Sequence, residues 1–219
     1  MTIFLFENCF YQFGNILMIL LENTDKSIFP FKSDSQQYQS YEDFVLKTFG
    51  GLNNTDLDKI TYEKFCTWKE KSPKLSEDSY PYTYRYVKDE KDKDTNKIKD
   101  ELKDIEFFLD ENQTIFHGGI FLSDSPKIGD EITTMEIFST TIDPYTASLH
   151  AIQEEKECLW IIKLNQKTKC LPVNIETLEE SEIIIIDSLK LKITNITSLS
   201  KIDDFGIKRK MDCIFLEQI

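Results

Sequence analysis

The feature that most constrains this 219-residue chain is an acidic pair followed directly by a run of isoleucines. Glu180 and Glu182 stand two residues apart, and residues 183–186 are all isoleucine. β-Branched runs favour strands, and side chains at i and i+2 of a strand project from the same face. We therefore expect a strand over 182–186 with both carboxylates at its start. Such a pair suits charge stabilisation and acid–base chemistry, and it serves equally well as an ordinary polar strand end.

Composition excludes several classes of function. Asp and Glu number 39 against 26 Lys and Arg, a net charge of −13, so nucleic acid is not an expected partner. The seven glycines include neither a dinucleotide-binding nor a phosphate-loop motif. Five cysteines without paired spacing predict reduced thiols and no disulfide framework. With only two histidines, we expect no metal site.

The first 21 residues contain two apolar pieces that polar residues interrupt. No basic residue precedes the apolar part and no small-residue cleavage site follows it, so the pattern is typical of neither a signal peptide nor a membrane span. We expect a packed helix or strand there, no association with a membrane, and a cytoplasmic protein. An effector delivered into another cell by a dedicated machine would have the same features.

Helical signals dominate the chain up to residue 110. Residues 40–49 begin with an N-cap pair and end at two glycines, and a second helix is expected over 55–68. Apolar residues at helical spacing predict a third helix over 98–109. Between them, residues 80–86 carry tyrosine at every second position, which indicates a short edge strand or an extended loop. These tyrosines either pack against the domain or form a binding surface.

The chain becomes strand-rich after residue 110. The first expected strand, residues 114–117, ends at His117 and leads into Gly118 and Gly119. Two glycines at a strand end allow a backbone to approach a ligand closely. A single histidine at a strand end has a structural interpretation as well as a functional one.

The next expected strand runs through Phe138 and ends in three hydroxyl residues, and a helix start follows. Three hydroxyls at a strand end can satisfy backbone groups at the turn, or they can hold a polar ligand and orient a carboxylate on a neighbouring strand. An aspartate followed by proline is a strong N-cap signal. The residues concerned are Ser139, Thr140, Thr141, Asp143 and Pro144.

Further strands are expected over 158–164, 182–186, 189–196 and 211–216. Short strands after a helical region indicate an α+β architecture. No linker rich in Pro, Gly or Ser divides the chain, so we expect residues 1–219 to form a single domain. It would consist of a helical lobe, 1–110, and a strand-rich core, 111–219.

The order of these motifs resembles that of the mono-ADP-ribosyltransferase family. A strand running into glycine, then Phe-Ser-Thr-Thr before a helix, then Glu-X-Glu with an apolar tail resembles the arginine–serine–glutamate class of toxins and vertebrate ecto-enzymes. The resemblance extends from about residue 98 to residue 219. It implies an ADP-ribosyltransferase-like fold, a helical N-terminal lobe followed by a split core of two small, mostly antiparallel sheets.

The resemblance also implies an activity, that of an NAD–protein ADP-ribosyltransferase. Such a glycosyltransferase cleaves nicotinamide from its substrate NAD and transfers ADP-ribose to a protein acceptor, here unidentified. Glu182 would stabilise the oxocarbenium ion that develops on the nicotinamide ribose. Glu180, in place of glutamine, would serve as the base for an arginine acceptor. Ser139, Thr140 and Thr141 would hold the NAD-binding sheet together and position Glu182, and residues 175–179 would recognise the target.

Position 117 departs from this class, which has arginine there. Arginine offers a permanent charge and a planar fork for phosphates, whereas a neutral histidine offers one donor. A histidine before glycine is similar to the diphtheria-toxin-like branch, in which it binds the adenine-side ribose. We expect His117 and Gly118 to contact NAD, with either weaker phosphate binding or a loss of transferase activity.

Two other functions stay open at this point. One is an NAD glycohydrolase, for which water is the acceptor, and the other is a catalytically silent module that binds NAD or a protein. The sequence does not determine the oligomeric state.

Overall fold

The computed structural model describes residues 43–44, 47, 54–88, 94–123, 125–153, 158–175, 181–202 and 208–219. The element expected within residues 1–21 lies outside these residues, as does most of the helix expected over 40–49. Its described members, Asp43, Phe44 and Lys47, are helical, and Phe44 is fully buried. None of the helices formed by described residues is long and apolar enough to cross a membrane.

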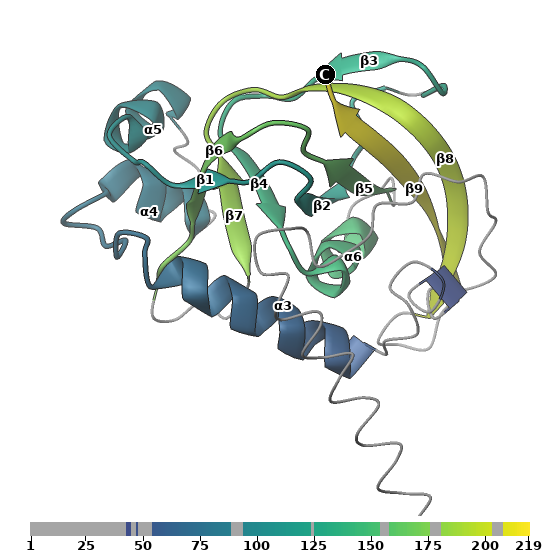
Figure 1. Ribbon diagram of the computed structural model, residues 1–219, viewed down its shortest axis with the longest axis horizontal. Helices are drawn as coiled ribbons and strands as arrows, with labels where there is room; N and C mark the ends of the chain where they lie inside the picture. The colour runs from purple at the N-terminus through teal and green to yellow at the C-terminus, as the bar shows by residue number, and fades with distance from the viewer. Residues whose placement is uncertain are drawn as a thin grey trace, which may run out of the picture.

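Helices lead the described part of the chain (Figure 1). They are α3 (Asn54–Lys69), α4 (Pro81–Val87) and α5 (Thr95–Leu102), and a later helix, α6 (Pro144–Gln153), follows the hydroxyl motif. Helix α3 confirms the helix predicted over 55–68. Helix α6 confirms the predicted start at Asp143, whose carboxylate accepts hydrogen bonds from the backbone N–H groups of Tyr145 (2.9 Å) and Thr146 (3.2 Å).

The extended conformation predicted for residues 80–86 is wrong, because Pro81–Val87 form α4. Pro81 stands in the first helical turn, where a missing N–H costs nothing. The four tyrosines, Tyr80, Tyr82, Tyr84 and Tyr86, are all half-buried against one core cluster, so the packing interpretation is confirmed.

The helix predicted over 98–109 is confirmed only up to Leu102, where α5 ends. Phe108–Leu109 form a short strand, β1, that pairs with residues 168–169. Ile98, Leu102, Ile105 and Leu109 are all buried, so their spacing fits a helix followed by a turn and a strand as well as one long helix.

Strands dominate the described residues after α5, and the strands expected from the sequence are present among them. The last two extend beyond their predicted bounds and form a long, curved hairpin (Figure 1). The strands are β2 (Thr114–Gly119), β3 (Glu131–Thr133), β4 (Phe138–Thr141), β5 (Cys158–Lys163), β6 (Thr168–Pro172), β7 (Glu182–Ile185), β8 (Lys190–Ile202) and β9 (Lys208–Gln218).

The strands are hydrogen-bonded in the order β1-β6-β7-β4-β2-β5-β9-β8-β3. All neighbours are antiparallel except β5 and β9, so the α+β class and the mostly antiparallel pairing are confirmed. This order has two arms, which correspond to the two small sheets that we expected. The first arm consists of β1, β6, β7 and β4, and the second consists of β2, β5, β9, β8 and β3. A single paired position, Phe116 with Thr141, joins them.

The isoleucine run of β7 is buried on both of its faces. Ile183 and Ile185 pack in a cluster with Trp160 of β5, between the two arms. Ile184 and Ile186 face the other way and pack with Ile98 and Leu102 of α5. Burial on both faces explains why the run lacks polar alternation. It also fixes the strand that carries Glu182, since burying each such side chain is worth about 2 kcal/mol.

Helix α6 lies against the second arm, which contains β2 and β5. In Figure 1 it lies within the curve of the β8–β9 hairpin. Its residues Ala147 and Ala151 share a core cluster with Phe116 of β2, Leu159 of β5 and Phe215 of β9. The helix that follows the hydroxyl motif therefore supports the strand that carries His117.

Candidate functional site

The register of β4 against β7 brings Ser139 beside Glu182. Thr141 pairs with Glu182 and Ser139 with Ile184, so the side chains of Ser139 and Glu182 are neighbours across the two strands. The Ser139 hydroxyl donates to Glu182 Oε1 at 2.6 Å. This length is typical of a charge-assisted O–H···O⁻ bond. Both residues are partly exposed, so a ligand can reach the carboxylate while the serine holds its orientation.

The other two hydroxyls of the motif serve the backbone. Thr140 donates to the carbonyl of Ile183 at 2.9 Å, and Thr141 accepts from the N–H of Asp143 at 3.0 Å. Both threonines are buried. The sequence predicted a strand that runs through Phe138 and ends in the three hydroxyls. The observed strand, β4, begins at Phe138 and ends in these hydroxyls. Of the three, it is Ser139 that contacts the carboxylate of Glu182.

His117 lies between the two arms of the sheet, among aromatic rings. Its ring centroid is 4.5 Å from that of Phe138 and 5.3 Å from that of Trp160. Its Nδ1 lies 2.8 Å from the carbonyl oxygen of Ser139. Burial lowers the pKa of His117 from 6.5 to about 4, against an opposing effect of the Ser139 carbonyl and with a small contribution from His150. The ring is therefore neutral at physiological pH.

The hydrogen bond to Ser139 determines which nitrogen of His117 carries the proton. A carbonyl oxygen can only accept, so in the neutral ring Nδ1 carries the hydrogen and Nε2 is an acceptor. The neutral His117 ring has one N–H donor, and this donor is hydrogen-bonded to Ser139 within the protein. A neutral imidazole with this tautomer can accept a hydrogen bond from a hydroxyl or an amide, and it offers no positive charge to a phosphate.

Three of the predicted site residues form one connected chain of contacts. The ring of His117 is hydrogen-bonded to the backbone carbonyl of Ser139, and the hydroxyl of Ser139 is hydrogen-bonded to the carboxylate of Glu182. Glu180 and residues 176–179 lie outside the described residues.

Gly118 stands where α6 crosses β2. A Cβ built at this position would lie 1.8 Å from the carbonyl oxygen of Ala147 and 2.6 Å from the amide nitrogen of Ala151. Close packing of α6 therefore requires glycine at 118. Both Gly118 and Gly119 belong to β2 and continue its pairing with β5, so the strand extends beyond the predicted end at His117. Contact of Gly118 with NAD stays a prediction.

Of the two aromatic rings beside His117, the sequence motif included Phe138 and did not single out Trp160. Trp160 pairs directly with His117 across β2 and β5, and it is 1% exposed. Its indole Nε1 has no hydrogen-bond partner among the described residues. Trp160 is one of only two tryptophans in the chain, but its position opposite His117 depends on a register that the sequence does not reveal.

The cysteines are part of the core. Cys158, Cys170 and Cys213 are buried, and all four described cysteines, with Cys66, are unpaired. Burial raises the pKa of Cys158 to about 12 and also raises the pKa of Cys170 and Cys213, so these thiols stay protonated. Within the described residues, no three His, Cys, Asp or Glu side chains gather as a metal site.

Comparison with known proteins identifies the fold. No family model matches the sequence, and no curated protein matches it. Solved structures of ADP-ribosyltransferases do match, so the chain has the ADP-ribosyltransferase fold.

Two of these structures illustrate the likeness. The ADP-ribosyltransferase Vis, solved in complex with the inhibitor M6, matches 77% of this chain and 86% of its own, with a TM-score of 0.53 and 15% identity. BECa, the ADP-ribosylating toxin of a binary enterotoxin of C. perfringens, was solved with NADH. It matches 84% of this chain with a TM-score of 0.50 and 16% identity. This chain covers 50% of the BECa chain.

Proposed function

We propose that this chain is a mono-ADP-ribosyltransferase that cleaves nicotinamide from NAD and transfers ADP-ribose to an arginine side chain of a protein. The observation that carries the proposal is the 2.6 Å hydrogen bond between Ser139 and Glu182 on adjacent strands of an ADP-ribosyltransferase fold. The matching structures of an ADP-ribosyltransferase and an ADP-ribosylating toxin support it.

In this proposal Glu182 acts on the nicotinamide ribose. When the bond between ribose C1′ and the nicotinamide nitrogen breaks, its electron pair leaves with nicotinamide and positive charge develops on the ribose. A carboxylate placed beside that charge stabilises the transition state more than the ground state. The hydroxyl of Ser139 holds one oxygen of the carboxylate in place before the reaction begins, so little reorganisation is needed.

The acceptor assignment depends on Glu180. A guanidinium has a pKa above about 12 and becomes a nucleophile only when a neighbouring base removes a proton. Glu180, two residues before Glu182, is the proposed base. The new bond then forms between the guanidine nitrogen and ribose C1′, and the proton passes to the carboxylate. The support for this step is the Glu-X-Glu sequence.

His117 is proposed to bind NAD through a hydroxyl group. Its Nδ1–H is engaged by Ser139, and its Nε2 accepts hydrogen bonds. A ribose hydroxyl is a donor of the right kind, whereas an anionic phosphate is not. The substitution of arginine by histidine would therefore change which part of NAD this strand holds.

Incubation of the pure protein with NAD labelled in the adenosine part, together with a cell lysate, tests the proposal. We expect label on protein, removal of that label by reagents specific for arginine linkages, and release of nicotinamide. Glu182→Gln should lower both signals by about a thousandfold, since it removes the charge opposite the transition state. Glu180→Gln should reduce labelling and spare nicotinamide release.

Other outcomes identify the alternatives. Release of nicotinamide without label would indicate a glycohydrolase. Neither signal, together with NAD binding by calorimetry, would indicate a silent binding module. A Glu182→Gln protein with the full rate would show that the catalytic carboxylate lies elsewhere.

A further inference from the structure

We propose that Tyr86 is a positioning residue for the Ser139–Glu182 pair and acts on it from α4 through the backbone of Ile137. The inference rests on the function proposed above. The hydroxyl of Tyr86 donates to the carbonyl oxygen of Ile137 at 3.1 Å. Ile137 immediately precedes β4, and Ser139 follows two residues later.

Ile137 has a backbone conformation that its side chain disfavours. Its φ is +55°, in the left-handed region that β-branched residues rarely adopt. The conformation persists only where surrounding contacts fix it. Here the side chain is 3% exposed, the N–H donates to the carbonyl of Ile186 at 3.3 Å, and the carbonyl accepts from Tyr86. Tyr86 thus completes the set of contacts that holds this corner.

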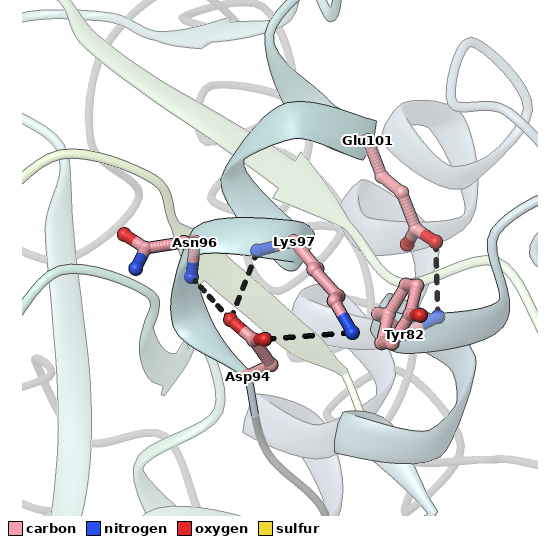
Figure 2. A network of polar contacts seen from close by, with 5 residues as sticks. All are labelled: Tyr82, Asp94, Asn96, Lys97 and Glu101. Atoms are coloured by element: carbon pink, nitrogen blue, oxygen red, sulfur yellow. Dashed lines mark hydrogen bonds and ion pairs between the residues drawn. The ribbon is translucent and has the colours of Figure 1, made fainter.

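Helix α4 can hold Ile137 because α5 holds α4. The carboxylate of Glu101 accepts hydrogen bonds from the backbone N–H groups of Tyr82 (3.0 Å) and Thr83 (2.8 Å), and from the Thr83 hydroxyl (2.7 Å). Figure 2 shows Glu101 beside Tyr82. The amine of Lys97 lies 4.6 Å from the centre of the Tyr82 ring. Asp94 caps the start of α5 in the same view. We call this unit, Pro81–Val87 with Thr95–Leu102, the α4–α5 brace.

The brace also contacts the residue before Ile137. Lys99 of α5 forms an ion pair of 2.8 Å with Glu136, and the carboxylate of Glu136 raises the pKa of Lys99. This pair is exposed, so it contributes little by itself. It nevertheless shows that both helices of the brace contact the two residues that lead into β4.

The consequence for the site follows from the short path between these groups. Without the Tyr86 hydroxyl, Ile137 can relax toward an ordinary conformation, and β4 then shifts at its first residues. Ser139 would move relative to Glu182, and small displacements of a catalytic group lower the rate strongly. Because Tyr86 acts through the backbone, its loss should lower kcat and leave NAD binding unchanged.

Tyr86→Phe tests the proposal, because it removes the hydroxyl and keeps the ring. We expect kcat for nicotinamide release to fall about tenfold while KM for NAD changes less than about twofold. In a Ser139→Ala background the same change should have no further effect, since the contact through which Tyr86 acts is already lost. Amides of residues 137–141 should exchange hydrogen faster, as measured by mass spectrometry.

Tyr84→Phe is the matched control. Tyr84 lies on the same helix and packs in the same cluster, and its hydroxyl makes no hydrogen bond to a described residue. It should leave kcat, KM and exchange of residues 137–141 unchanged.

Three results would overturn the proposal. The first is an unchanged kcat in Tyr86→Phe. The second is a raised KM with an unchanged kcat in the same variant, which would indicate that Tyr86 contacts NAD directly. The third is that the effects of Tyr86→Phe and Ser139→Ala on kcat are additive. If the wild-type protein does not cleave NAD, the proposed function fails, and hydrogen exchange still decides whether Tyr86 holds β4. Unchanged exchange would then overturn this inference too.

Discussion

Two adjoining parts of the site are built by different forces. The β4–β7 pair presents Ser139 and Glu182, partly exposed polar side chains that a hydrogen bond holds together. Strand β2 presents His117, enclosed by aromatic rings, and Gly118, against the backbone of α6. Close packing restricts which side chains fit at positions 117 and 118 of β2. Positions 139 and 182 are partly exposed, so packing does not restrict their side chains in the same way.

Substitutions in the two regions should therefore affect different properties of the protein. A change in β2 alters contacts that fold the protein, so it should appear in the free energy of unfolding. A change in the β4–β7 pair alters a contact between partly exposed groups, so it should appear in the reaction rate with little loss of stability.

The largest effect is expected for Gly118→Ala. The new methyl group would lie 1.8 Å from a carbonyl oxygen of α6, and the atoms nearest to it are all backbone, so the helix itself must move. We expect the free energy of unfolding to fall by about 3 kcal/mol or more. Urea denaturation followed by circular dichroism measures it.

Gly129→Ala provides the control for this experiment. Gly129 has a φ of +97° and nothing within 4 Å of its built Cβ, so alanine there meets backbone strain without a clash. The expected cost is about 1–2 kcal/mol. An equal loss in the two variants would show that α6 does not pack on β2 as closely as described.

A smaller effect, and on the rate, is expected for Ser139→Ala. Without the hydroxyl, Glu182 loses a partner that fixes its orientation. We expect the rate of nicotinamide release to fall about thirtyfold, equivalent to about 2 kcal/mol in the barrier. The free energy of unfolding should change by less than about 1 kcal/mol, because the bond is partly exposed. Initial rates and urea denaturation measure the two quantities.

Ser198→Ala removes a bond of the same type elsewhere. The Ser198 hydroxyl donates to Asp212 Oδ1 at 2.5 Å across the β8–β9 hairpin. This variant should keep the wild-type rate. A large loss of stability in Ser139→Ala with an unchanged rate would contradict the division between the two regions.

The fold could be anticipated where one local rule decides the structure. The isoleucines of 183–186 fit a strand whichever face is buried, and Asp143 with Pro144 starts a helix by local hydrogen bonding alone. The tyrosines of 80–86 misled the prediction, because all four are half-buried although they lie on different sides of a helix, and their spacing also fits one face of an edge strand.

The site could be anticipated in its residue types and less in its contacts. Ser139 and Glu182 stood out as polar residues beside apolar strands. Their hydrogen bond depends on the β4–β7 register, and the enclosure of His117 depends on Trp160 in β5, which pairs with β2. Such pairings arise from tertiary packing between segments far apart in sequence. The contact from Tyr86 to Ile137 spans 51 residues and has no local signal.

The smallest effect is the dependence of stability on pH through His117. Its pKa is about 4 in the folded chain and near 6.5 when unfolded. Between these values the unfolded chain binds a proton that the folded chain excludes, so stability falls as pH falls from 6.5 toward 4. Allowing for partial exposure of the ring, we expect a loss of about 1 kcal/mol between pH 6.5 and 5.

His117→Gln isolates this contribution, because glutamine can donate to the Ser139 carbonyl and does not titrate. The difference in unfolding free energy between wild type and variant should shrink as the pH is lowered through this window. His150→Gln, which replaces the other histidine of the chain, should retain most of the wild-type slope, because His150 is the smallest of the three influences on the pKa of His117. A slope that His117→Gln leaves unchanged would mean that His117 is not desolvated. His117 would then be as open to solvent as Ser139 and Glu182 are, and the contrast between the two regions would be lost.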